Sequence, residues 1–276
     1  MKKLLFLLAD FAICIAIYGQ TTYDEWVSRS FDYIESDSLA EAVDALREAM
    51  RLEPAHPQNV FLLSNMGTLQ RRLGRLQEAE ISYTSALGLL PHNETLLRNR
   101  ASLRGERGTY DAAIDDWTTL IALQPQNEDY LYERALCRLV TGDTVGARLD
   151  LESIDRINPK SAKARMGMAY VYKAQGEWAM ALDLYNALLE HNKDNPRLLR
   201  ERAEVYLQEG HITAALQDVN RAIELRPAEP LGYVLRAQIR LQRKDTEYAL
   251  RDIQKAQELG ADARIVTQIK EKMQEK

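Results

Sequence analysis

Alanine recurs at a nearly constant interval along most of the chain. After a first spacing of 37 residues, the five spacings that follow are 34 residues each. The positions are Ala42, Ala79, Ala113, Ala147, Ala181, Ala215 and Ala249. Glycine keeps the same interval from Gly74 to Gly210. A period of this length indicates an array of similar supersecondary units, each of which buries its apolar face against its neighbours.

Prolines mark the places where one repeat meets the next. They stand at Pro54, Pro91, Pro125, Pro159 and Pro227, with Lys193 at the equivalent place of one repeat. Proline removes a backbone donor and clashes with the preceding turn, so helices end where it appears. The second half of each repeat has apolar residues at i, i+3, i+4 and i+7, as in Ala181, Leu184, Tyr185 and Leu188. Each repeat is therefore predicted to hold two helices with a turn between them.

This pattern resembles the tetratricopeptide repeat family. The 34-residue unit of that family has a large residue at position 4, small residues at positions 8 and 20, alanine at position 27 and proline at position 32. In the first repeat these are Trp26, Ser30, Ala42, Ala49 and Pro54. The resemblance covers seven repeats, which start near residues 23, 60, 94, 128, 162, 196 and 230. It implies an all-α, right-handed superhelical solenoid over residues 20–261.

Both ends of the chain differ from the repeats. Residues 262–276 are polar except for one apolar stripe, which predicts a helix that caps the last repeat. At the other end, Lys2 and Lys3 precede an apolar run that ends before Gly19, as in a secretory signal peptide. The run is shorter than the roughly 20 residues of a spanning helix, and Asp10 interrupts it. We expect cleavage near Gly19, removal of residues 1–19 and export to a bacterial periplasm. Anchorage to the inner membrane is the alternative.

Arginine and aspartate follow the repeat in phase. Position 7 is arginine in five repeats, at Arg29, Arg100, Arg134, Arg202 and Arg236. In the last four of these, aspartate follows sixteen residues later, at Asp116, Asp150, Asp218 and Asp252. The repeats with Met66 and Met168 at position 7 carry Ser82 and Leu184 at the second place. This joint presence and absence predicts a bidentate ion pair between the two helices of each such repeat.

Catalytic and metal-binding patterns are absent from the sequence. The four histidines fall in different repeats, and neither a phosphate loop nor a nucleophile motif is present. Cys137 stands beside Leu136 within a predicted helix, as a buried structural thiol would. The net charge of −5 disfavours a nucleic-acid binder, which needs a basic face. We expect neither an enzyme nor a metal, cofactor or nucleic-acid site.

The resemblance implies that the first helices line a concave groove for a peptide or a partner helix. Positions 5 and 9 lie one turn apart on that surface. The predicted partner-binding residues are Arg71, Arg98, Tyr132, Leu136, Met166, Tyr170, Lys173 and Arg200. We expect a protein-interaction scaffold of the bacterial cell envelope that binds a peptide or protein segment with apolar anchors and some acidic character. A structural module that self-associates within an envelope complex is the alternative.

Overall fold

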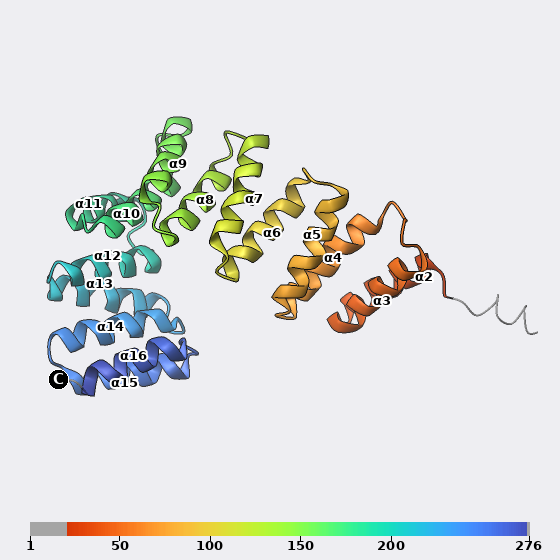
Figure 1. Ribbon diagram of the computed structural model, residues 1–276. Helices are drawn as coiled ribbons and strands as arrows, with labels where there is room; N and C mark the ends of the chain where they lie inside the picture. The colour runs from red at the N-terminus through yellow and green to blue at the C-terminus, as the bar shows by residue number, and fades with distance from the viewer. Residues whose placement is uncertain (1–20, 275–276) are drawn as a thin grey trace, which may run out of the picture. The chain divides into compact units, whose positions relative to one another are not determined.

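The computed structural model describes residues 21–274. Within this range the chain forms α-helices joined by short turns, without a strand (Figure 1). The chain forms two compact blocks, one that ends at Pro125 and one that begins at Gln126. The N-terminal block holds α2 (Tyr23–Glu35), α3 (Leu39–Leu52), α4 (Asn59–Arg72), α5 (Leu76–Leu89), α6 (Glu94–Glu106) and α7 (Tyr110–Leu123). The C-terminal block holds α8 (Glu128–Val140), α9 (Thr144–Ile157), α10 (Ala162–Gln175), α11 (Trp178–His191), α12 (Pro196–Gln208), α13 (Ile212–Leu225), α14 (Pro230–Gln242), α15 (Thr246–Glu258) and α16 (Ala263–Gln274).

Side-chain caps explain where several first helices begin. Thr22 Oγ1 accepts from the Glu25 N–H at 3.2 Å, and the Glu25 carboxylate accepts from the Thr22 N–H at 3.0 Å, which is a capping box. Asn127 Oδ1 accepts from two backbone N–H groups of the first turn of α8. Pro196 and Pro230 are the first residues of α12 and α14, where the missing proline N–H has no helical partner to lose.

The turn between the two helices of a repeat requires one residue in the left-handed region. Glycine fills this place in the five middle repeats, at Gly74, Gly108, Gly142, Gly176 and Gly210. In the first and last repeats the same place is taken by Asp37 (φ 56°) and Lys244 (φ 65°). Glycine adopts this conformation without steric cost, which explains its periodic occurrence.

Small residues let the helices of each repeat approach closely. Ala135, Ala147, Ala169 and Ala181 are 0% exposed. A Cβ atom at Gly67 would lie 2.8 Å from Tyr83 Cε1, so the ring of Tyr83 occupies the space that glycine leaves. The expectation of an all-α array of seven two-helix repeats with a final helix is confirmed.

The final helix closes the core of the last repeat. Val266 and Ile269 on α16 are buried and pack with Ile253 and Leu241. Within residues 21–274 no helix has the length and apolar character needed to cross a membrane. The predicted signal peptide and its cleavage site lie outside the described residues.

Candidate partner-binding surface

The four arginine–aspartate pairs predicted from the repeat phase are present as bidentate ion pairs. Arg134 Nε lies 3.0 Å from Asp150 Oδ2, and Arg134 Nη2 lies 2.6 Å from Asp150 Oδ1. The same two-pronged geometry joins Arg100 to Asp116, Arg202 to Asp218, and Arg236 to Asp252. All four aspartates are buried, with exposures of 3–8%. Such pairs fix the register of the two helices because two parallel hydrogen bonds fix the orientation of both groups.

A second arginine completes the site in three of these repeats. Arg138 Nη1 donates to Asp150 Oδ2 at 2.8 Å and to the Gly146 carbonyl at 3.0 Å. Arg104 and Arg240 stand at the same position of their repeats and make the equivalent pair of bonds. These arginines at position 11 are not among the residues predicted above, although they keep the period of the position-7 arginines. Each buried aspartate in these repeats is thus shared by two guanidinium groups.

The position-7 arginines also connect successive repeats. Arg202 Nη1 donates to Asn186 Oδ1 of the preceding repeat at 2.8 Å, and Arg236 Nη1 donates to Asn220 Oδ1 at 2.8 Å. Arg100 Nη1 donates in the same way to Thr84 Oγ1 at 3.1 Å. These side chains therefore belong to the packing of the array and are not available to a partner.

An aromatic and charged surface lies on the first helices α8, α10 and α12. The Tyr170 hydroxyl accepts a hydrogen bond from Arg197 Nη2 at 3.0 Å, and Lys173 Nζ lies 5.7 Å from the centre of the Tyr170 ring. Tyr132 on α8 and Tyr185 on α11 interact electrostatically with Tyr170 and with one another. We call Tyr132, Tyr170 and Tyr185 the tyrosine cluster.

Two hydroxyls of the tyrosine cluster have no hydrogen-bond partner among the described residues. The Tyr185 hydroxyl is buried without a partner, and the Tyr132 hydroxyl, which is less buried, also has none. Tyr83, which holds the position of Tyr185 in the second repeat, has its hydroxyl 3.0 Å from Thr68 Oγ1. The residue equivalent to Thr68 is Tyr170, whose hydroxyl pairs with Arg197 instead. The fifth repeat therefore lacks the hydrogen bond that joins Tyr83 to Thr68 in the second repeat, and its equivalent residues, Tyr185 and Tyr170, belong to the tyrosine cluster.

The phenols of the tyrosine cluster are neutral at pH 7, and burial raises their pKa values further. Desolvation, with the nearby Tyr170 as the next cause, raises the pKa of Tyr132 to about 12. Desolvation and Glu201 raise the pKa of Tyr170, and Arg197 opposes the shift. Desolvation by burial also raises the pKa of Tyr185. At neutral pH all three phenols are therefore hydrogen-bond donors.

The basic residues predicted for this surface are mostly neutralised within the protein. Lys173 Nζ lies 2.8 Å from carboxylate oxygens of both Glu201 and Glu204, and the Lys173 side chain is only 16% exposed. Arg200 forms an ion pair with Glu229. The positive charges of Lys173 and Arg200 are thus largely compensated by carboxylates of the next first helix and of the junction that follows it.

The other predicted partner residues lie in different surroundings. Leu136 is half-buried on α8, one turn after Tyr132, and Met166 is half-buried on α10 and packs against the core. Arg71 and Arg98 belong to the N-terminal block. Arg71 Nε donates to Glu106 Oε2 at 2.9 Å, whereas Arg98 is exposed and pairs with no described residue.

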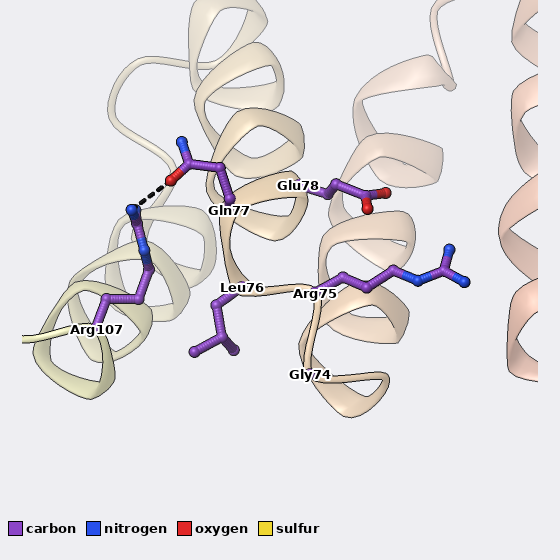
Figure 2. Close-up of a pocket in the computed structure, with 6 residues that line it drawn as sticks. All are labelled: Gly74, Arg75, Leu76, Gln77, Glu78 and Arg107. Atoms are coloured by element: carbon purple, nitrogen blue, oxygen red, sulfur yellow. Dashed lines mark hydrogen bonds between the residues drawn. The ribbon is translucent and has the colours of Figure 1, made fainter.

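The polar side chains that line a hollow of about 480 Å³ in the N-terminal block do not converge on one point (Figure 2). Arg107 and Gln77 point toward one another and form a hydrogen bond, while Arg75 and Glu78 extend to the other side of the ribbon (Figure 2). Among the described residues no group of histidine, cysteine or carboxylate side chains has the arrangement of a metal site. Cys137 is buried in α8, at 7% exposure.

Comparison with known proteins agrees with this architecture. Family models described as tetratricopeptide repeat match residues 62–97, 98–162, 141–203 and 200–229. TTC0263, a thermophilic repeat protein of this type from Thermus thermophilus, is 23% identical, with a TM-score of 0.56 over 66% of this chain and 99% of that chain. The Cut9–Hcn1 hetero-tetramer of the APC/C shares the fold at 12% identity, with a TM-score of 0.64 over 91% of this chain and 55% of that chain. None of the curated proteins compared matches the chain.

Another solved structure is similar over nearly the whole length of both chains. It is a tetratricopeptide repeat protein from Parabacteroides merdae ATCC 43184, with a TM-score of 0.85 and coverage of 91% of this chain and 98% of that chain. The sequence identity over this match is 34%, and the helical period, the buried small residues and the junction prolines have the family pattern. The chain therefore belongs to the tetratricopeptide repeat family.

Proposed function

We propose that the surface formed by α8, α10 and α12 binds an extended segment of a partner protein. Tetratricopeptide repeat proteins are typically non-catalytic scaffolds for protein interactions. The observation that supports this surface is the pair Tyr132 and Tyr170, which are both partly exposed, together with the Tyr132 hydroxyl, which has no hydrogen-bond partner among the described residues. Aromatic residues of this kind provide much of the binding energy at protein interfaces because one end is apolar and the other is polar.

Main-chain recognition fits this surface better than recognition of acidic side chains. A phenol that stays protonated donates to a peptide carbonyl, and an extended segment presents such carbonyls at regular intervals. Lys173 and Arg200 already bind carboxylates of this chain, so an acidic partner would have to displace Glu201, Glu204 or Glu229. We therefore propose a partner with apolar anchors whose backbone, rather than its charge, is recognised.

Selection from a display library of random peptides tests the proposal. Peptides selected on the wild type are measured by fluorescence anisotropy against Y132A/Y170A and Y132F/Y170F. We expect affinity to fall at least tenfold in the alanine variant and several-fold in the phenylalanine variant, which lacks only the hydroxyls. Tyr248→Ala on α15 is the matched control, because Tyr248 is 54% exposed and lies outside the cluster. Equal affinity of wild type and Y132A/Y170A would refute this binding surface.

We propose further that the scaffold works in the bacterial cell envelope. The N-terminal sequence supports export, since two lysines and an apolar run precede Gly19. Expression in a bacterial host, followed by fractionation and N-terminal sequencing, tests this. A periplasmic chain that begins at Gln20 is the expected result, and an intact Met1 in the cytosolic fraction would contradict it.

Self-association is the second candidate function. Val145 and Leu149 lie one turn apart on α9 and are 69% and 56% exposed, so they form a small apolar pair on the surface of this helix. If copies of the chain associate through this face, light scattering will show a mass that rises with concentration. V145E/L149E would then return the mass to that of a monomer.

A further inference from the structure

The fifth repeat departs from all the others at position 4. This position is large and apolar in six repeats, at Trp26, Leu63, Leu97, Leu131, Leu199 and Tyr233, but it is Arg165 in the fifth. The fifth repeat also has Lys193 in place of the junction proline, which is absent from the last repeat as well. At position 4 a large apolar side chain normally fills the space between helices. Arginine cannot fill this space in the same way, because its guanidinium must remain solvated or paired.

A hollow of about 550 Å³ opens next to Arg165. Its apolar wall includes Met166 of α10, Leu188 of α11 and Leu198 of α12, and the latter two are buried. The three helices thus contribute one long apolar side chain each.

Three basic groups also line this hollow. They are Lys160, Arg165 and His191, and none of the ten lining residues is acidic. Neither Lys160 nor Arg165 forms an ion pair with any residue that the structure describes. This differs from the arginines of the neighbouring repeats, since Arg134 and Arg202 are bonded to buried aspartates. His191 Nδ1 lies 3.1 Å from the Ala187 carbonyl, so Nε2 is the ring nitrogen left for a ligand.

We propose that this hollow binds a free aliphatic carboxylate, whose chain lies on Met166, Leu188 and Leu198 while its carboxylate pairs with Arg165 and Lys160. The combination identifies the chemical class. A purely apolar ligand would leave Arg165 without a counter-ion, and a small hydrophilic anion would make no use of the half-buried Met166 side chain at the wall of the hollow. Arg165 is suited to the carboxylate because its planar guanidinium accommodates both oxygens. This site is separate from the tyrosine cluster and goes beyond the proposed binding of a partner segment.

Calorimetry with octanoate, acetate and 1-octanol tests the site. Octanoate is expected to bind at least tenfold more tightly than either acetate, which lacks the chain, or 1-octanol, which lacks the charge. Equal binding of octanoate and 1-octanol, or no binding of octanoate, would overturn the proposal.

Variants locate the ligand. Arg165→Leu installs the residue found at position 4 of four other repeats, so this variant is expected to fold, and it should reduce octanoate affinity at least tenfold. Lys160→Ala should reduce it several-fold, and circular dichroism verifies that both variants are folded. The matched control is Arg75→Leu, which removes an exposed arginine that forms no ion pair with a described residue and should leave affinity unchanged. Unchanged affinity in the Arg165 variant would overturn the proposal, as would loss of affinity in Y132A/Y170A, which would place the ligand on the tyrosine cluster.

Discussion

Removing one buried aspartate tests whether the ion pairs hold the repeats together. Asp150 is 3% exposed and accepts three hydrogen bonds, from Arg134 Nε at 3.0 Å, Arg134 Nη2 at 2.6 Å and Arg138 Nη1 at 2.8 Å. Asp150→Asn removes the charge and places an amide donor opposite a guanidinium donor. Breaking one side of a buried pair costs about 3–5 kcal/mol, because the remaining charge stays desolvated. We expect the free energy of unfolding to fall by this amount.

Urea denaturation followed by circular dichroism at 222 nm measures the change. Asp155→Asn provides the matched control, because Asp155 lies on the same helix, is exposed and forms no ion pair with a described residue. Its effect should stay within about 0.5 kcal/mol. If Asp150→Asn and Asp155→Asn unfold at the same urea concentration, the buried pair contributes nothing and the reasoning fails.

The fifth repeat supplies a second form of the same test. It carries Met168, Tyr172 and Leu184 at the three positions that Arg134, Arg138 and Asp150 occupy in the fourth repeat. Exchange of a complete buried ion-pair group for packed apolar residues is often neutral or stabilising. The triple variant R134M/R138Y/D150L should therefore recover most of the stability that D150L alone loses. A triple variant as unstable as D150L would show that the arginines have other essential contacts.

Three further predictions follow from packing and burial. Gly67→Ala should destabilise the protein by about 1–3 kcal/mol in urea denaturation, because the new Cβ would lie 2.8 Å from Tyr83 Cε1. Gly88→Ala should instead stabilise it by about 0.5–1 kcal/mol, because a Cβ at this helical position would have no atom within 4 Å. Burial raises the pKa of Tyr132 to about 12 in the folded state, so the stability that its neutral phenol contributes is lost as the pH rises from about 10 through 12. At pH 11, folded wild type and folded Y132F should therefore differ little in phenolate absorbance at 295 nm. The same two proteins unfolded in urea should differ by the absorbance of about one tyrosine. Tyr185→Phe should raise the free energy of unfolding by about 1–3 kcal/mol, since it removes a buried hydroxyl without a partner, and an unchanged midpoint would mean that the hydroxyl is satisfied in solution.

The periodic part of the architecture could be predicted because similar residues recur at the same positions of most repeats. Prolines and left-handed glycines mark the helix ends, and the joint occurrence of Arg134 and Asp150 with their equivalents indicates which side chains face one another. The charge state of the surface could not be predicted in the same way. The carboxylates that neutralise Lys173 stand at Glu201 and Glu204, nearly one repeat later, where only the packing of successive first helices brings them within 2.8 Å. The sequence does place Glu201 and Glu204 among the acidic residues of this surface, but their pairing with Lys173 depends on that packing.

The hollow beside Arg165 was hidden for a different reason. A substitution at position 4 shows that an apolar residue is missing, but whether neighbours collapse into the space depends on three helices at once. In the fifth repeat the usual pattern is inverted, since the interior positions 7, 11 and 23 are apolar or aromatic while position 4 is charged. The apolar and aromatic residues at positions 7, 11 and 23 remove the buried ion pair from between the helices. The arginine at position 4 places a cation without an ion-pair partner among the described residues beside an apolar wall. The core of this repeat is closed without a pairing partner for Arg165, since Tyr185 and Val205 are 0% exposed and Arg165 forms no ion pair with a described residue, so the proposed carboxylate would be its counter-ion.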